Sequence, residues 1–136
     1  MKFQHSIKTI IAALLLLLAF FSPASSMDDP GFKIERMVIS GKIVDLEPIA
    51  IGGVFSAVTE KVYCFLETRD IDEDTSVSIV WYFEDKEMAR VSLPLSKGPR
   101  WRTYSSKKLY SLKGDWKVEL QDSSGIVHNT VTFQVQ

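Results

Sequence analysis

The chain has 136 residues, of which 46% are hydrophobic and 24% are charged, and its formal net charge is -1. A chain of this length forms one domain at most, and its apolar fraction is too high for an intrinsically disordered protein. The near-neutral charge argues against a nucleic-acid-binding protein, because neutralising phosphates requires an excess of Lys and Arg.

Residues 1–26 have the pattern of a secretory signal peptide. Lys2 and Lys8 precede an apolar run from Ile10 to Phe21, and small residues follow it. As a helix this run rises only about 18 Å, which is short of the roughly 30 Å hydrocarbon core of a bilayer. We therefore predict an exported protein, periplasmic or secreted, that is cleaved before Met27 and keeps no membrane span. An uncleaved membrane anchor is the alternative.

The rest of the chain is predicted to be a flexible lead, residues 27–34, followed by a single β domain, residues 35–136. Hydrophobic residues alternate with period two after the lead, which indicates strands, and no sustained helical period occurs. Cys64 is the only cysteine, so no internal disulfide can form and stability must come from burial.

Seven segments carry strand patterns separated by turn signals, and they span residues 35–46, 57–67, 76–83, 88–95, 101–110, 115–121 and 126–135. Pro94 lacks an amide donor, which places the fourth segment at a sheet edge. The turn Asp122–Gly125 predicts a hairpin between the last two segments. Short strands at this spacing predict an all-β fold, an immunoglobulin-like β-sandwich of about seven strands. A small open barrel is the alternative.

Two positions fit the immunoglobulin pattern and one does not. Cys64 and Trp81 stand where such a domain has its second-strand cysteine and third-strand tryptophan, but Leu120 occupies the place of the partner cysteine. Alternation around Trp81 and Trp116 predicts that both rings lie in the core. Cys64 is flanked by apolar residues, which predicts a buried and unreactive thiol.

Five motifs together resemble the bacterial family named domain of unknown function 2914. They are VYCF at 62–65, VWYF at 80–83, RVSLPL at 90–95, WRTYSSK at 101–107 and GDWKVELQDSSGIV at 114–127. The resemblance extends from about Glu35 to Val135. It implies a small extracytoplasmic or membrane-tethered bacterial β domain, and it brings no established activity.

Catalytic and metal-binding patterns are weak in this chain. Ser105–Lys108 matches S-x-x-K, but its surroundings are strand-like rather than helical. Asp70–Asp74 begins like a calcium loop, yet Thr75 and Trp81 stand where the loop needs Gly and Glu. A looser calcium site at one end of the sandwich is the alternative for this acidic stretch. His128, in the last predicted strand, is expected to face solvent. We therefore expect no enzyme activity, no cofactor and no metal site.

The most unusual feature is a basic-aromatic segment within an otherwise acidic domain. Its candidate partner-binding residues are Arg100, Trp101, Arg102, Tyr104, Lys107 and Lys108. In a strand, residues 101, 103, 105 and 107 share one face, and residues 102, 104, 106 and 108 share the other. One interpretation is structural, with Trp101 closing an end of the sandwich and Tyr104 packed under it. The other is recognition of an anionic or glycan-like partner, because Arg and aromatic residues often dominate binding energy.

The sequence thus predicts an exported, non-catalytic binding or interaction module whose partner is a protein or glycan of the cell envelope rather than a nucleic acid. The alternative is a structural accessory domain of the envelope that associates through its edge strands. The oligomeric state and the identity of the partner stay open at this point.

Overall fold

The computed structural model describes residues 29–136, so the predicted signal peptide lies outside the described residues. This part of the chain is built from strands, and it has no helix of the length and apolarity that crossing a membrane requires. The first strand begins at Lys33, inside the segment expected to be a lead, and Phe32 is already buried in the core.

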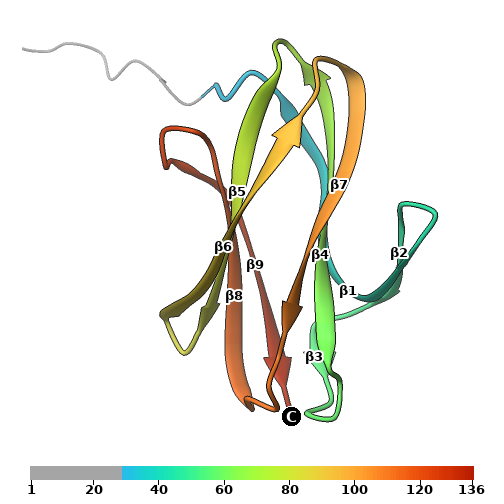
Figure 1. Cartoon of the computed structure of the whole chain (residues 1–136), viewed down its shortest axis with the longest axis vertical. Coiled ribbons are helices and arrows are strands. Elements are labelled where there is room, and N and C mark those ends of the chain that lie inside the picture. Colours follow the sequence, from blue (N-terminus) through green and yellow to red (C-terminus); the bar gives the residue numbers. More distant parts are fainter. Residues whose placement is uncertain (1–28) are drawn as a thin grey trace, which may run out of the picture.

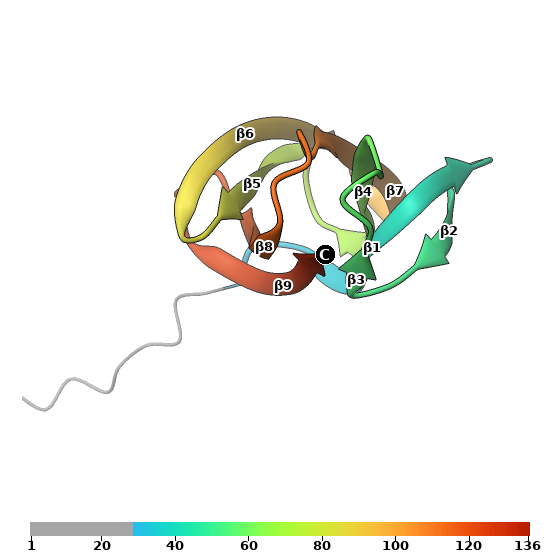
Figure 2. The ribbon, with the colours of Figure 1, turned by 90° about the horizontal axis from the view of Figure 1, so that it is seen from below.

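Nine strands form the domain (Figure 1): β1 (Lys33–Val44), β2 (Glu47–Ile51), β3 (Val54–Phe55), β4 (Lys61–Ile71), β5 (Thr75–Phe83), β6 (Lys86–Leu95), β7 (Gly98–Lys108), β8 (Gly114–Gln121) and β9 (Val127–Val135). Sheet A has the order β2-β1-β4-β7, and sheet B has the order β3-β9-β8-β5-β6. Seen from below, the two sheets face each other and the β1–β2 hairpin extends away from them (Figure 2). This confirms the predicted β-sandwich.

The strand count exceeds the predicted seven because the chain turns back after Val44. Asp45 and Leu46 have φ angles of 50° and 57°, which give a two-residue hairpin loop between β1 and β2. Such loops usually carry Asn or Gly, because those residues tolerate positive φ at little cost. Leu46 gives no such signal in the sequence, and the hairpin was therefore not predicted. The two-residue strand β3 adds the ninth strand.

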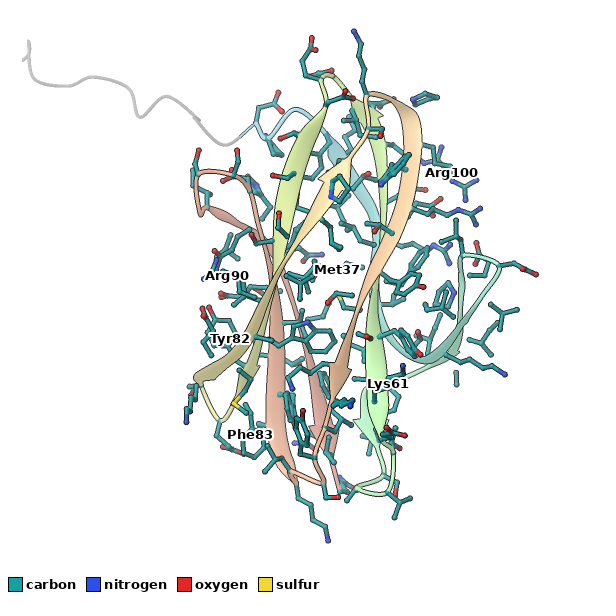
Figure 3. All side chains as sticks on the ribbon, in the orientation of Figure 1. Met37, Lys61, Tyr82, Phe83, Arg90 and Arg100 are labelled. Atoms are coloured by element: carbon teal, nitrogen blue, oxygen red, sulfur yellow. The ribbon has the colours of Figure 1, made fainter. Side chains whose placement is uncertain are left out.

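The core lies between the sheets, where Figure 3 shows Met37. Trp81 and Trp116 are fully buried, as predicted, and the rings of Trp116 and Phe133 stack with their centroids 5.7 Å apart. Cys64 is also buried there. Burial raises the pKa of its thiol to about 12, so the thiol is protonated and unreactive at neutral pH, as expected.

Prolines stand on three of the four edge strands of the described domain. Pro48 lies on β2, Pro94 on β6 and Pro99 on β7, and the fourth edge is the very short β3. The predicted edge position of Pro94 is confirmed. Each proline removes a backbone donor that an incoming strand would need, so these edges resist strand addition.

Candidate binding surface on sheet A

The two faces of β7 divide the predicted binding residues into two groups. Trp101 packs against the core, and the Ser105 hydroxyl accepts a hydrogen bond of 3.2 Å from Trp81 Nε1. Lys107 Nζ lies 5.8 Å from the centroid of the Trp116 ring, and burial lowers the pKa of this lysine. These residues belong to the inner face, which confirms the predicted alternation. The outer face is left with Arg100, Arg102, Tyr104, Ser106 and Lys108.

Glu67 of β4 is the centre of an ion-pair cluster on the outer face of sheet A. Its side chain is only 4% exposed, and its carboxylate accepts hydrogen bonds from Arg36 Nε at 3.0 Å and from Arg100 Nε. Burial opposes ionisation of Glu67, but the hydrogen bonds from the two guanidinium groups outweigh it and lower its pKa. The hydrogen bond to Glu67 likewise raises the pKa of Arg36. Glu67 is therefore a paired carboxylate that holds the arginines in place.

Glu47 extends this cluster from the hairpin strand β2. Its carboxylate accepts hydrogen bonds from Arg36 at 3.1 and 3.2 Å and from Arg102 at 2.7 Å. Arg102 also donates to the backbone oxygen of Leu46 at 3.2 Å. These bonds tie the β1–β2 hairpin to the outer face of sheet A. We call this cluster the arginine end; its residues are Arg36, Glu47, Glu67, Arg100 and Arg102.

Aromatic rings lie next to the arginine end on the same face. Phe65 is fully buried there, and the Arg36 guanidinium lies over its ring at 4.9 Å from the centroid. Tyr104 makes an edge-to-face contact with Tyr63, with ring centroids 5.8 Å apart, and is 41% exposed. Because Tyr104 and Trp101 lie on opposite faces of β7, the interpretation that Tyr104 packs under Trp101 is wrong.

The other end of this face carries lysines without acidic partners. Lys61 of β4 stands directly opposite Lys108 of β7, and Tyr63 stands opposite Ser106. Lys61 Nζ lies 5.6 Å from the centroid of the Tyr63 ring. Within residues 29–136, neither Lys61 nor Lys108 forms an ion pair. We call this group the lysine end; its residues are Lys61, Tyr63, Tyr104, Ser106 and Lys108.

Figure 3 shows the relation of the two ends. Arg100 and Lys61 lie toward opposite ends of sheet A, and both are on the side away from Tyr82 and Arg90 of sheet B. Sequence reasoning found the β7 half of this surface from its cations. It missed Lys61, Tyr63 and Glu67 because they belong to β4, whose pairing with β7 the sequence does not show.

The acidic stretch Asp70–Asp74 does not converge on a single point. Asp70 forms an ion pair with Lys33 at 3.5 Å, and Asp74 accepts a hydrogen bond of 2.7 Å from the backbone N–H of Lys97. Over the described part of the chain, no three His, Cys, Asp or Glu side chains form a group suited to a metal ion. The carboxylates of Asp70 and Asp74 thus serve local structure.

His128 differs from its expected position. Its side chain is only 10% exposed, and its Nε2 atom lies 2.6 Å from Asp122 Oδ2. The hydrogen bond with His128 is the main reason why the pKa of Asp122 is lowered. The expectation of a solvent-facing histidine was wrong because the turn at Asp122–Gly125 folds Asp122 back onto the last strand. The pair closes the β8–β9 hairpin.

A cleft of about 590 Å³ lies at one end of sheet B and brings acidic side chains together. Glu84 accepts a hydrogen bond of 2.8 Å from the backbone N–H of Asp115. Asp115 in turn accepts one of 2.9 Å from Gln134 Nε2. These carboxylates are acceptors in local structural hydrogen bonds.

Residues 74–135 match the family described as "Protein of unknown function (DUF2914)". The chain therefore resembles this family over β5 to β9, whereas β1 to β4 lie outside the matched range. The resemblance suggested by the motifs is confirmed, although over a shorter stretch than Glu35–Val135. No curated protein matches the sequence.

Solved structures similar to this chain include two glycosidases. One is a mutant beta-glucosidase from Listeria innocua in complex with laminaribiose, with a TM-score of 0.50, 9% identity, and coverage of 77% of this chain and 16% of that one. The other is a beta-D-glucoside glucohydrolase from Trichoderma reesei, with a TM-score of 0.50, 11% identity, and coverage of 77% and 19%. The chain thus spans less than a fifth of either enzyme, and at such low identity the similarity concerns the fold alone.

Proposed function

We propose that this protein is an exported, non-catalytic binding module that uses the outer face of sheet A to bind an anionic partner, a protein or a glycan, in the cell envelope. Export rests on the signal-peptide pattern of residues 1–26. The lysine end is the observation that carries the proposal. It combines two cations without acidic partners in the described domain and two tyrosines, which offer broad and rigid contact area.

A binding role fits the chemistry of this domain better than catalysis. The thiol of Cys64 is buried and protonated, which removes the strongest nucleophile of the chain. The carboxylates at the two places where acidic side chains gather already have partners within the protein. Glu67 at the arginine end is held in an ion pair, and Asp115 in the cleft accepts a hydrogen bond. The proposal therefore assigns no reaction to them.

The face of sheet A is favoured over the sheet edges as the contact surface. Strand addition needs a row of free backbone donors and acceptors, and Pro48, Pro94 and Pro99 interrupt such rows on three edges. Side chains on a sheet face do not depend on these backbone groups.

A titration followed by nuclear magnetic resonance tests the proposed surface. The isotope-labelled protein would be titrated with two polyanions, polyglutamate and polygalacturonate, at low and high salt. We expect amide shifts in the segments 61–67 and 102–108 with at least one of them, and we expect added salt to reduce these shifts. Shifts confined to sheet B, or no shifts with either polyanion, would contradict the proposal.

Association through an edge strand is a second candidate function, and one observation favours it. Ile49 and Ile51 are exposed on β2, which is paired with β1 on one side only. Sedimentation of the wild type and of a variant with Ile49→Thr and Ile51→Thr tests this candidate. A self-associated species that is present in the wild type and lost in the variant would support this candidate. Sedimentation of both proteins as monomers would contradict self-association through β2.

A further inference from the structure

We propose that the lysine end binds the carboxylate groups of an acidic polysaccharide, with Lys61 and Lys108 as the contacting cations and with Tyr63 and Tyr104 supporting the sugar rings. This inference rests on the proposed function and deepens it by naming the class of ligand. It also assigns different roles to the cations of the basic-aromatic segment, which the sequence presents as one group.

The first step concerns the repulsion between Lys61 and Lys108. The two residues are direct partners in the antiparallel β4–β7 pair. Cβ atoms at such positions are about 5 Å apart, and like charges there destabilise a sheet. A carboxylate placed between the two ammonium groups would relieve this repulsion. Lysine suits such a contact because its ammonium group is a compact charge with three donors.

The second step concerns the other cations of the segment, which are either held in ion pairs or placed on the inner face of β7. Arg100 donates to Glu67, and Arg102 donates to Glu47. Lys107 lies on the inner face, over the rings of Tyr110 and Trp116. An incoming carboxylate would have to displace a carboxylate of the protein at the arginine end, whereas the lysine end offers it a site without such competition.

The third step concerns the choice of a polysaccharide over a protein. Protein interfaces have a desolvated core from which Lys is depleted. The lysine end has two lysines, a serine hydroxyl and the partly exposed ring of Tyr104 on an extended strand face. This mixture of charge, hydroxyl and ring edges complements a polymer rich in hydroxyl and carboxylate groups. Tyrosine presents an apolar ring and a polar tip, as a sugar surface requires.

Binding of polygalacturonate by the protein, expressed from the full chain, tests the inference. In isothermal titration calorimetry we expect the variant with Lys61→Gln and Lys108→Gln to bind at least tenfold more weakly than the wild type. The matched control carries Lys86→Gln and Lys97→Gln, which remove the same charge from exposed positions outside the lysine end. We expect the control to bind within about twofold of the wild type, because long-range charge is largely screened by salt.

A second variant, Tyr104→Ala, separates sugar recognition from charge. We expect it to weaken binding of polygalacturonate and to leave binding of polyglutamate unchanged, because only the sugar polymer has rings for Tyr104 to support. Circular dichroism checks that each variant is folded, and the single substitution Lys108→Gln serves if the double variant is not. If Tyr104→Ala changed the affinity for both polymers equally, the proposal that the tyrosines support the sugar rings would be overturned.

The outcomes distinguish this inference from the proposed function. Wild-type binding of polyglutamate that is as tight as binding of polygalacturonate would overturn the polysaccharide ligand and support an anionic protein partner on the same surface. Binding of neither polymer would overturn both proposals. Unchanged binding of polygalacturonate by the Lys61 and Lys108 variant would overturn the assignment of these lysines as contacts.

Discussion

The arginine end and the lysine end lie on the same face of sheet A and share the strands β4 and β7, but they differ in how their charges are compensated, and the arginine end also includes Arg36 of β1 and Glu47 of β2. Three guanidinium groups meet two carboxylates at the arginine end. At the lysine end, the pairing register sets Lys61 against Lys108, whereas it sets Glu67 against Arg102. The difference lies in the carboxylates within reach of each cation and not only in the residue directly opposite, because Arg100 stands opposite Arg69 and is nevertheless paired with Glu67.

This difference gives the two ends different roles in the domain. The arginine end joins all four strands of sheet A. Glu67 of β4 accepts hydrogen bonds from arginines on the neighbouring strands β1 and β7, and Glu47 of β2 accepts them from Arg36 of β1 and from Arg102 of β7, the opposite edge strand. Charge-assisted hydrogen bonds of this kind are stronger than neutral ones and fix side-chain geometry. The two lysines of the lysine end repel each other across the β4–β7 pair, and we expect Lys61 and Lys108 to contribute little to the free energy of unfolding.

The largest effect should come from Glu67→Ala, which removes the acceptor shared by Arg36 and Arg100. We expect the free energy of unfolding to fall by about 2–3 kcal/mol. This is less than the roughly 3–5 kcal/mol that removing one partner of a fully buried ion pair costs, because both arginines keep partial access to water. Urea denaturation measures the change. The control is Glu87→Ala, which removes an exposed ion pair with Arg90 and should cost less than about 1 kcal/mol. Equal losses in the two variants would show that the arginine end is not a stabilising cluster.

The fold could largely be predicted from the sequence, because period-two alternation depends on local residues. Val77, Ile79 and Trp81 on β5, and Trp116 and Val118 on β8, are buried as their spacing indicates. Proline chemistry likewise placed β6 at an edge. These features need no knowledge of which strands pair.

The candidate surface could be predicted only in part, because it depends on strand register. The cations of β7 are visible in the sequence, but the partner of each comes from β4 or β2, more than thirty residues away for Glu67 and Arg100. The hairpin that delivers Glu47 turns at Leu46, a residue that rarely adopts positive φ. Nothing local in the sequence therefore separates the engaged arginines from the available lysines.

Lowering the pH should have a smaller effect on the free energy of unfolding. The pKa values of Glu67 and Asp122 are both lowered in the folded protein, so the folded state binds protons more weakly than the unfolded chain. The stability that these carboxylates contribute is complete above the ordinary carboxyl pKa of about 4, and it is lost as the pH falls through the lowered values. We therefore expect the difference in unfolding free energy between the wild type and Glu67→Gln to narrow between about pH 5 and pH 2.

Chemical denaturation at a series of pH values measures this narrowing. The Lys61→Gln and Lys108→Gln variant is the control, because its lysines stay charged throughout this range and its difference from the wild type should not follow the titration of Glu67. A constant difference between the wild type and Glu67→Gln down to pH 2 would contradict a lowered pKa of Glu67 that is linked to stability.

The smallest effect should come from the Lys61→Gln and Lys108→Gln variant itself. Removing two like charges at directly opposite positions should leave the free energy of unfolding unchanged or raise it by up to about 0.5 kcal/mol. The gain should shrink at high salt, which already screens the repulsion, and the Lys86→Gln and Lys97→Gln control should show no comparable dependence. A loss of more than about 1 kcal/mol would mean that the lysines stabilise the fold as the arginines do. A gain would instead mean that the domain retains a repulsive pair at a cost in stability, as binding sites often do, because a ligand supplies the missing negative charge.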